Sequence, residues 1–162
     1  MKVFMFYDTD ITGWEEYDIT GDDYRELMST CCKYGKTMAF TIMAPDGISY
    51  VNELEKFAVD KEANIKEVSI RYGYPGQKFQ PYVRYYRVCP ELCELLTSMT
   101  DSIFKLLFGG GQTNPEDPTF YRADGSVFFS SVIHEGEITL YPREDEDVSN
   151  IVSKPHWTEK EV

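Results

Sequence analysis

Residues 119–141, TFYRADGSVFFSSVIHEGEITLY, carry the clearest fold signal in the chain. Three runs rich in β-branched and aromatic residues lie within this stretch, at 119–122, 126–133 and 137–141. Two turn sequences separate them, Ala123-Asp124-Gly125 and His134-Glu135-Gly136, and both end in glycine. Short runs of this composition joined by glycine-containing turns are typical of neighbouring antiparallel strands. The stretch therefore predicts a three-strand meander.

Further strands are predicted on the N-terminal side of this meander. Compact apolar or aromatic runs place them at 2–7, 37–43, 66–72 and 82–88, with a shorter strand around 16–19. A first helix is predicted to begin after Thr20, because Thr20 and Asp23 have the spacing of a capping box. We expect this helix to run to Tyr34 and to end at Gly35.

The longest helix is expected at 90–107. Pro90 suits its first position, and one apolar stripe follows at helical spacing: Leu92, Leu95, Leu96, Met99, Ile103, Leu106 and Leu107. Gly109-Gly110-Gly111 would end this helix, and an irregular loop is expected at 114–118. Weaker signals indicate a helix at about 50–59 and a short acidic helix at 144–153.

These elements predict a single α+β domain that spans residues 1–162. Neighbouring strands with helices inserted between groups of strands indicate a largely antiparallel sheet. One long core helix and one or two shorter helices are expected to pack against this sheet. The composition suits a packed core, since 42% of the residues are hydrophobic and 15% are aromatic.

Negative charge is concentrated near the two ends of the sequence. The net charge is −12; residues 1–26 hold eight acidic and two basic residues, and residues 135–162 hold eight acidic and three basic residues. Such a field repels nucleic acid and anionic membranes, and it attracts basic proteins. No run reaches the roughly 18 apolar residues of a membrane helix. Asp8 and Asp10 also precede any secretory apolar stretch. We therefore expect a soluble, cytoplasmic protein.

The densest acidic groups are the candidates for contact with a protein partner, and nearby aromatic residues are candidate apolar anchors. Rim charges mainly raise the association rate, whereas buried aromatic side chains hold a complex together. The predicted partner-binding residues are Trp14, Tyr17, Asp22, Asp23, Glu144, Asp145, Glu146, Asp147 and Trp157.

A chemical site is the competing interpretation. His134, Glu135 and Glu137 could bind a metal or transfer protons in a small hydrolase. A turn with solvated carboxylates is favoured, because the segment lacks the two-histidine helix of a zinc protease and no catalytic motif occurs elsewhere. The four cysteines, at 31, 32, 89 and 93, are expected to be reduced thiols. Their spacing supplies no closed zinc site, so we expect no metal and no cofactor.

Three segments in the last third of the chain resemble a known group of proteins. They are Asn114-Pro115-Glu116-Asp117-Pro118, residues 121–130 (YRADGSVFFS) and His134-Glu135-Gly136-Glu137. Over 114–151 the chain is similar to small acidic immunity-type proteins of bacterial polymorphic toxin systems. The resemblance implies a non-enzymatic cytosolic protein that binds a cognate toxin and occupies its active or substrate-binding surface. A regulatory module without a fixed partner of this kind is a third interpretation.

Overall fold

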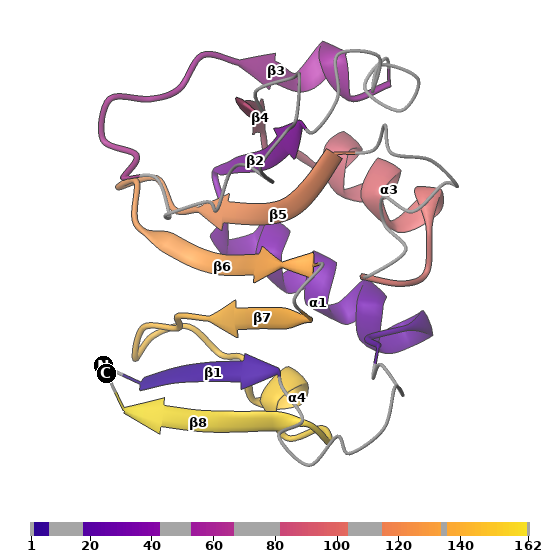
Figure 1. Cartoon of the computed structure of the whole chain (residues 1–162), viewed down its shortest axis with the longest axis vertical. Coiled ribbons are helices and arrows are strands. Elements are labelled where there is room, and N and C mark those ends of the chain that lie inside the picture. The colour runs from indigo at the N-terminus through magenta and orange to yellow at the C-terminus, as the bar shows by residue number, and fades with distance from the viewer. Residues whose placement is uncertain are drawn as a thin grey trace, which may run out of the picture.

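The fold is built on one antiparallel sheet whose strands differ in length (Figure 1). The computed structural model describes residues 2–6, 18–42, 53–66, 82–103, 115–133 and 136–161. Within them the strand order is β3-β4-β2-β5-β6-β7-β1-β8, and every neighbouring pair is antiparallel. The strands are β1 Lys2–Phe6, β2 Thr37–Ile42, β3 Ala58–Val59, β4 Tyr82–Arg87, β5 Pro115–Tyr121, β6 Val127–Val132, β7 Glu137–Leu140 and β8 Trp157–Glu161. The predicted α+β fold with a largely antiparallel sheet is confirmed.

The helices pack on one face of this sheet. They are α1 Gly21–Tyr34, α3 Pro90–Met99 and α4 Ser149–Val152. In Figure 1, α1 crosses behind the middle of the sheet and α4 lies behind β1 and β8. The main core joins buried residues of all three helices to buried residues of the strands. Tyr24 of α1 donates a hydrogen bond of 2.6 Å to the carbonyl of Leu96, which fixes α1 against α3.

A smaller core covers the opposite face. Ala39, Ile65, Tyr85 and Tyr121 form it, so residues near 65 shield the middle of the sheet. The turn at Gly125 packs closely against this cover. Gly125 has a φ of +80°, and a Cβ added there would lie 2.2 Å from the carbonyl oxygen of Asn64. Both the backbone conformation and the close approach therefore require glycine.

The strongest local predictions are confirmed. β1, β2, β4 and the meander of β5, β6 and β7 lie where the sequence predicts strands, and α1 spans the predicted helix. The predicted capping box is wrong, because the side chain of Thr20 makes no capping hydrogen bond. Thr20 instead forms a β-bridge with Ser102. The amide of Gly21 donates to the carbonyl of Asp101 over 2.8 Å beside this bridge.

The extent of the predicted long helix is wrong. α3 ends at Met99 after 10 residues and is shorter than the 14-residue α1. Thr100 is extended, and the amide of Ile103 donates to the carbonyl of Ile19 over 3.0 Å. Ile103 is still buried in the main core, whereas Leu95 is only half-buried. The remainder of the predicted helix and Gly109-Gly110-Gly111 lie outside the described residues.

Two further segments differ from the sequence predictions. The expected loop at 114–118 is largely strand, because β5 begins at Pro115. Its pairing with β2 shifts between Ala39 and Thr41, and such a bulge accommodates proline within a sheet. The predicted acidic helix at 144–153 shrinks to the four residues of α4, and β8 follows it without having been predicted.

Several weaker predictions fall partly or wholly on residues that the structure does not describe. Residues 67–81 hold most of the strand predicted at 66–72, and residues 7–17 hold half of the strand predicted around 16–19. Within the predicted helix at about 50–59, the described part contains a 3-10 helix at Glu55–Phe57 followed by β3.

The prediction of four reduced cysteines is wrong for two of them. Cys32 of α1 and Cys93 of α3 form a disulfide, with their Cα atoms 6.2 Å apart. Cys31 is a buried thiol and Cys89 is a half-buried thiol. Among the described residues, no helix has the length and apolar character needed to cross a membrane.

Candidate functional site

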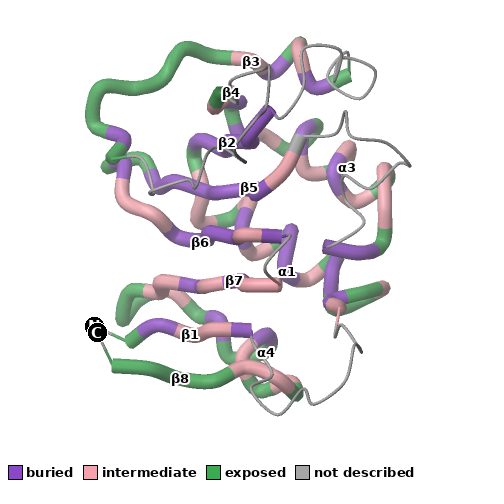
Figure 2. Tube along the Cα trace, viewed as in Figure 1, coloured by how far each residue is buried: buried purple, intermediate pink, exposed green. Residues whose placement is uncertain are grey.

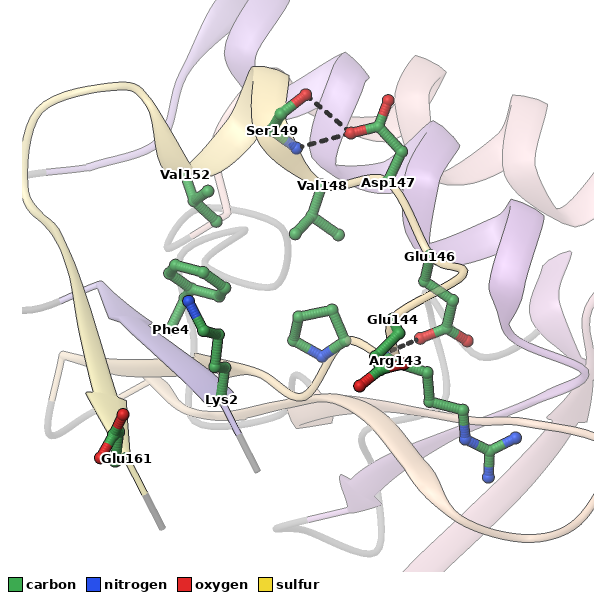
Figure 3. A pocket seen from close by; sticks show the side chains of 11 residues that line it. Lys2, Phe4, Arg143, Glu144, Glu146, Asp147, Val148, Ser149, Val152 and Glu161 are labelled. Carbon is green, nitrogen blue, oxygen red and sulfur yellow. Dashed lines mark hydrogen bonds between the residues drawn. The ribbon is translucent and has the colours of Figure 1, made fainter.

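A large groove lies at the β8 end of the sheet (Figure 3). It has a volume of about 1180 Å³ and lies between β1, β8, α4 and the segment that joins β7 to α4. We call it the acidic groove. Its apolar lining comes from Phe4, Pro142, Val148 and Val152, and its polar lining comes from Lys2, Arg143, Glu144, Glu146, Asp147, Ser149 and Glu161.

The apolar part of the acidic groove is built by two elements that are distant in sequence. Phe4 projects from β1 on the face that carries the main core, where it is half-buried. Figure 3 shows Val148 and Val152 pointing toward the ring of Phe4 from α4 and its N-terminal end. Apolar surface of this kind, left open beside a core, is suited to receive an apolar side chain from another molecule.

The basic side chains of the acidic groove are occupied by acids that lie outside it. Lys2 forms an ion pair of 2.7 Å with Glu159. Arg143 forms an ion pair with Asp124 and so points away from the groove. Within the described part of the chain, Glu144 makes no hydrogen bond or ion pair, and the same holds for its exposed neighbour Asp145. The rim therefore carries two exposed carboxylates without an ion pair to a described residue, although the charge of the neighbouring Arg143 acts on Asp145.

Two turn interactions fix the segment that carries this charge. Asp147 accepts hydrogen bonds from the amide and the hydroxyl of Ser149, at 3.0 and 2.6 Å (Figure 3). These bonds to Ser149 lower the pKa of Asp147. The amide of Asp147 in turn donates to the hydroxyl of Tyr34 over 2.9 Å, which ties the segment to α1. Glu144 and Asp145 are thus presented by an ordered backbone.

Arg122 is the main anchor of the same segment. Its guanidinium donates two hydrogen bonds to Glu146, at 2.6 and 2.5 Å, and the exposed fraction of each of these side chains is 8%. It also donates to the carbonyls of Val127 and Tyr141, each at 2.6 Å. Burial alone would raise the pKa of Glu146. The hydrogen bonds and the positive charge of Arg122 have the larger effect, so the pKa of Glu146 lies below its ordinary value.

This pairing contradicts the solvent exposure expected of one predicted site residue. Glu146 was expected to be solvated, yet its carboxylate is almost fully covered and bound to Arg122. The carboxylate of Glu146 is thus held inside the chain, and it fixes the backbone that carries Glu144 and Asp145. The sequence offered little warning, because Arg122 stands 24 residues before Glu146.

The other predicted acidic group, at the start of α1, is exposed but partly neutralised. Asp22 pairs with Arg25 at 2.5 Å. Asp23 and Glu26 both pair with Lys154, each at 2.6 Å. The chain's own cations therefore reduce the negative field of this group.

A second hollow joins the start of α1 to the start of β8. It has a volume of about 210 Å³, and both Asp23 and Trp157 line it. Trp157 packs edge-on against Phe6 with ring centroids 5.4 Å apart, so one predicted aromatic anchor lies close to a predicted acid. Trp14 and Tyr17 lie outside the described residues, and their predicted role stays a prediction.

The competing chemical site is only partly within the described residues. His134 and Glu135 lie outside them, and Glu137 is half-buried in β7 opposite Val132. In the described ranges, no three His, Cys, Asp or Glu side chains are arranged to hold a metal ion. The hydrolase interpretation stays untested.

The arrangement suits recognition of a surface that is both apolar and cationic. An apolar side chain can enter beside Phe4 and Val152 while a lysine or arginine next to it meets Glu144. Sequence reasoning missed Phe4, Val148, Val152 and Arg122, and the aromatic run around Phe4 indicated only a buried strand. Comparisons with protein-family models, with curated proteins and with solved structures found no match for this chain.

Proposed function

We propose that this chain is a non-enzymatic binding protein that neutralises a basic protein, a cognate bacterial toxin, by covering its active or substrate-binding surface. The acidic groove carries the proposal, because it combines an open apolar lining with exposed carboxylates that form no ion pair within the described part of the chain. Toxins that act on nucleic acid need cationic surfaces to bind phosphates. An acidic inhibitor can occupy such a surface by matching its charge.

The acidic groove combines exposed charges with an apolar lining, and this combination supports a binding role. Glu144 and Asp145 are exposed, so they attract a cationic partner over a distance and raise the association rate. Phe4 and Val152 supply contact area that slows dissociation once water has left the interface. The resemblance of residues 114–151 to immunity-type proteins supports the same role. The protein acts in the cytoplasm, and its net charge of −12 opposes binding to nucleic acid and to anionic membranes.

Capture from extracts of the native host tests the proposal. The wild-type chain is expected to retain one basic protein that Glu144→Lys/Asp145→Lys does not retain. Asp60→Lys/Glu62→Lys is the matched control, because it changes the net charge equally at exposed positions beside β3, at the other end of the sheet. This control is expected to retain the same protein.

The captured protein must also behave as a toxin. Its expression alone in a susceptible bacterium is expected to stop growth, and coexpression of the wild-type chain or of the Asp60→Lys/Glu62→Lys control is expected to restore it. Coexpression of Glu144→Lys/Asp145→Lys should fail to restore growth. Equal retention and equal rescue by both double variants would remove the acidic groove from the binding surface.

A further inference from the structure

β8 is an end strand with an open outer edge. It pairs with β1 on one side, and among the described strands none lies on its other side (Figure 1). A strand paired on one side only presents a row of backbone N–H and C=O groups along the other. Residues 158–161 are all exposed, and Figure 2 shows this stretch in green along the lower edge of the sheet. The outer edge of β8 is therefore accessible to another strand.

Charged side chains such as Lys160 are the edge protection that β8 has, whereas proline and bulges, which also block such edges, are absent from it. The strand contains no proline, and its register with β1 continues without a bulge from Lys2 opposite Glu161 to Phe6 opposite Trp157. The strand at the other end of the sheet, β3, has only two residues and offers a much shorter template. Of the two end strands, β8 is thus the one that a partner strand can follow over several residues.

The side chains of β8 specify the chemistry of a strand that pairs with it. Glu161 stands opposite Lys2, Glu159 opposite Phe4, and Trp157 opposite Phe6. Opposed residues share one face of a sheet, so Trp157, Glu159 and Glu161 lie on the face that carries the main core and the acidic groove. An added strand would meet an aromatic ring and then two carboxylates at alternate positions on this face.

We propose that the outer edge of β8 binds an extended segment of the basic partner as an additional strand of the sheet. The segment carries an apolar residue next to Trp157 and a basic residue next to Glu161, and the position between them faces Glu159, which already pairs with Lys2. The inference rests on the proposed function and adds the conformation and sequence pattern of the bound segment. A second copy of this chain is disfavoured as the occupant, because each copy has a net charge of −12.

Glu161 connects this edge to the acidic groove. It lines the groove and is also the last residue of β8. A partner strand on β8 would therefore bring the residues next to it in the partner's chain toward Glu144 and Phe4. One continuous partner surface can use both the backbone edge and the side-chain groove.

Backbone N-methylation of a peptide tests the proposal without altering the protein. The probe is a blocked peptide of about six residues in which lysine alternates with threonine and one terminal lysine is replaced by leucine. Two isomers carry N-methyl groups on alternate residues, one on the odd and the other on the even positions. In an added strand, only alternate amides donate to the neighbouring strand. One isomer is therefore expected to lose binding at least tenfold, while the other binds like the unmethylated probe.

The site of binding is read from amide hydrogen exchange. Binding of the probe, and of the captured partner, is expected to slow exchange of backbone amides at 158–161. Equal affinity of the two isomers, absence of probe binding, or unchanged exchange in β8 contradicts the proposal, as does a dimer that protects the same amides without the probe.

The outcome for the partner separates this inference from the proposed function. A partner that needs Glu144 and Asp145 but leaves β8 exchange unchanged would uphold the proposed function alone. A probe that pairs with β8 in a chain that captures no basic protein would uphold the docking edge alone.

Discussion

Arg122 and Glu146 show how a single buried ion pair shapes a surface site. Each side chain is 8% exposed, and Arg122 also holds two backbone carbonyls. Taking both charges out of water costs free energy, which the bidentate geometry and the extra hydrogen bonds offset. Removing one partner leaves the other buried and unpaired. The pair therefore makes the backbone that carries Glu144 and Asp145 depend on a residue in the turn before β6.

Arg122→Met is expected to lower the free energy of unfolding by about 3 kcal/mol at neutral pH, because it leaves the carboxylate of Glu146 buried without its partner. Arg143→Met is the matched control, since the ion pair between Arg143 and Asp124 is about half exposed. An exposed pair of this kind contributes little to the free energy of unfolding. Urea unfolding of both variants measures the difference, and equal losses would contradict the assigned role of Arg122.

The contribution of the Arg122–Glu146 pair to the free energy of unfolding decreases as the pH falls. The pKa of Glu146 is lower in the folded chain than its ordinary value, so the stabilisation is complete above the unfolded pKa of about 4.3. It is lost as the pH falls through the lower folded pKa. The difference in unfolding free energy between the wild type and Arg122→Met should therefore be largest near neutral pH and should narrow in acid. A difference that grows below pH 4 would reverse the sign and contradict the pairing.

At the scale of elements, prediction succeeded where the decisive signal was local. The run of β2 and the helical spacing of Tyr24, Leu27 and Met28 in α1 each contain the pattern of their own element. β8 lacks such a pattern, because as an edge strand it keeps charged side chains such as Glu159 and Lys160 on both faces. The end of α3 is also decided at a distance, by the pairing of residues 101–103 with residues 19–21.

The disulfide between α1 and α3 is a second case of long-range control. A sequence states only that four cysteines are present, whereas pairing requires that Cys32 and Cys93 meet across two packed helices. In the chain-entropy model, closing a loop with a sequence separation of 61 stabilises the folded state by about 4 kcal/mol. While oxidised, the bond thus contributes a large share of the net stability of a domain of this size, a contribution that is lost where cytoplasmic thiol systems keep the two cysteines reduced.

Reduction is expected to lower the free energy of unfolding by about 4 kcal/mol, because the unfolded chain regains the freedom that the disulfide removed. Alkylation of the denatured protein should label only Cys31 and Cys89 before reduction and all four cysteines after it. Cys32→Ser is the control, since its stability should not respond to the reductant. Four labelled cysteines in protein that was purified without reductant would contradict the disulfide.

At the scale of the whole molecule, the candidate site depends on how distant segments meet. The acidic groove combines the start of the chain at Lys2 and Phe4 with the segment from Pro142 to Val152. Sequence reasoning found the acids because charge density is visible along the chain. It could not tell paired acids from unpaired ones, because the cations that pair with them are distant in sequence. Arg122 pairs with Glu146, and Lys154 pairs with Asp23. The structure thus distinguishes acidic residues by whether a cation of the chain pairs with them, which the sequence alone does not show.

This distinction predicts the salt dependence of partner association. Glu144→Lys/Asp145→Lys should slow association with the captured partner more than Asp22→Lys/Asp23→Lys, because Arg25 and Lys154 already compensate the second pair. The wild-type rate should fall as salt rises, since the Debye length shortens from about 30 Å at 0.01 M to about 10 Å at 0.1 M. In the Glu144→Lys/Asp145→Lys variant this salt dependence should be flatter. Stopped-flow measurements at several salt concentrations give both quantities for all three proteins.

A wild-type association rate that does not change with salt concentration would assign the acidity to solubility. Equal slowing by the two double variants would show that the partner senses total charge rather than the exposed acids at the acidic groove.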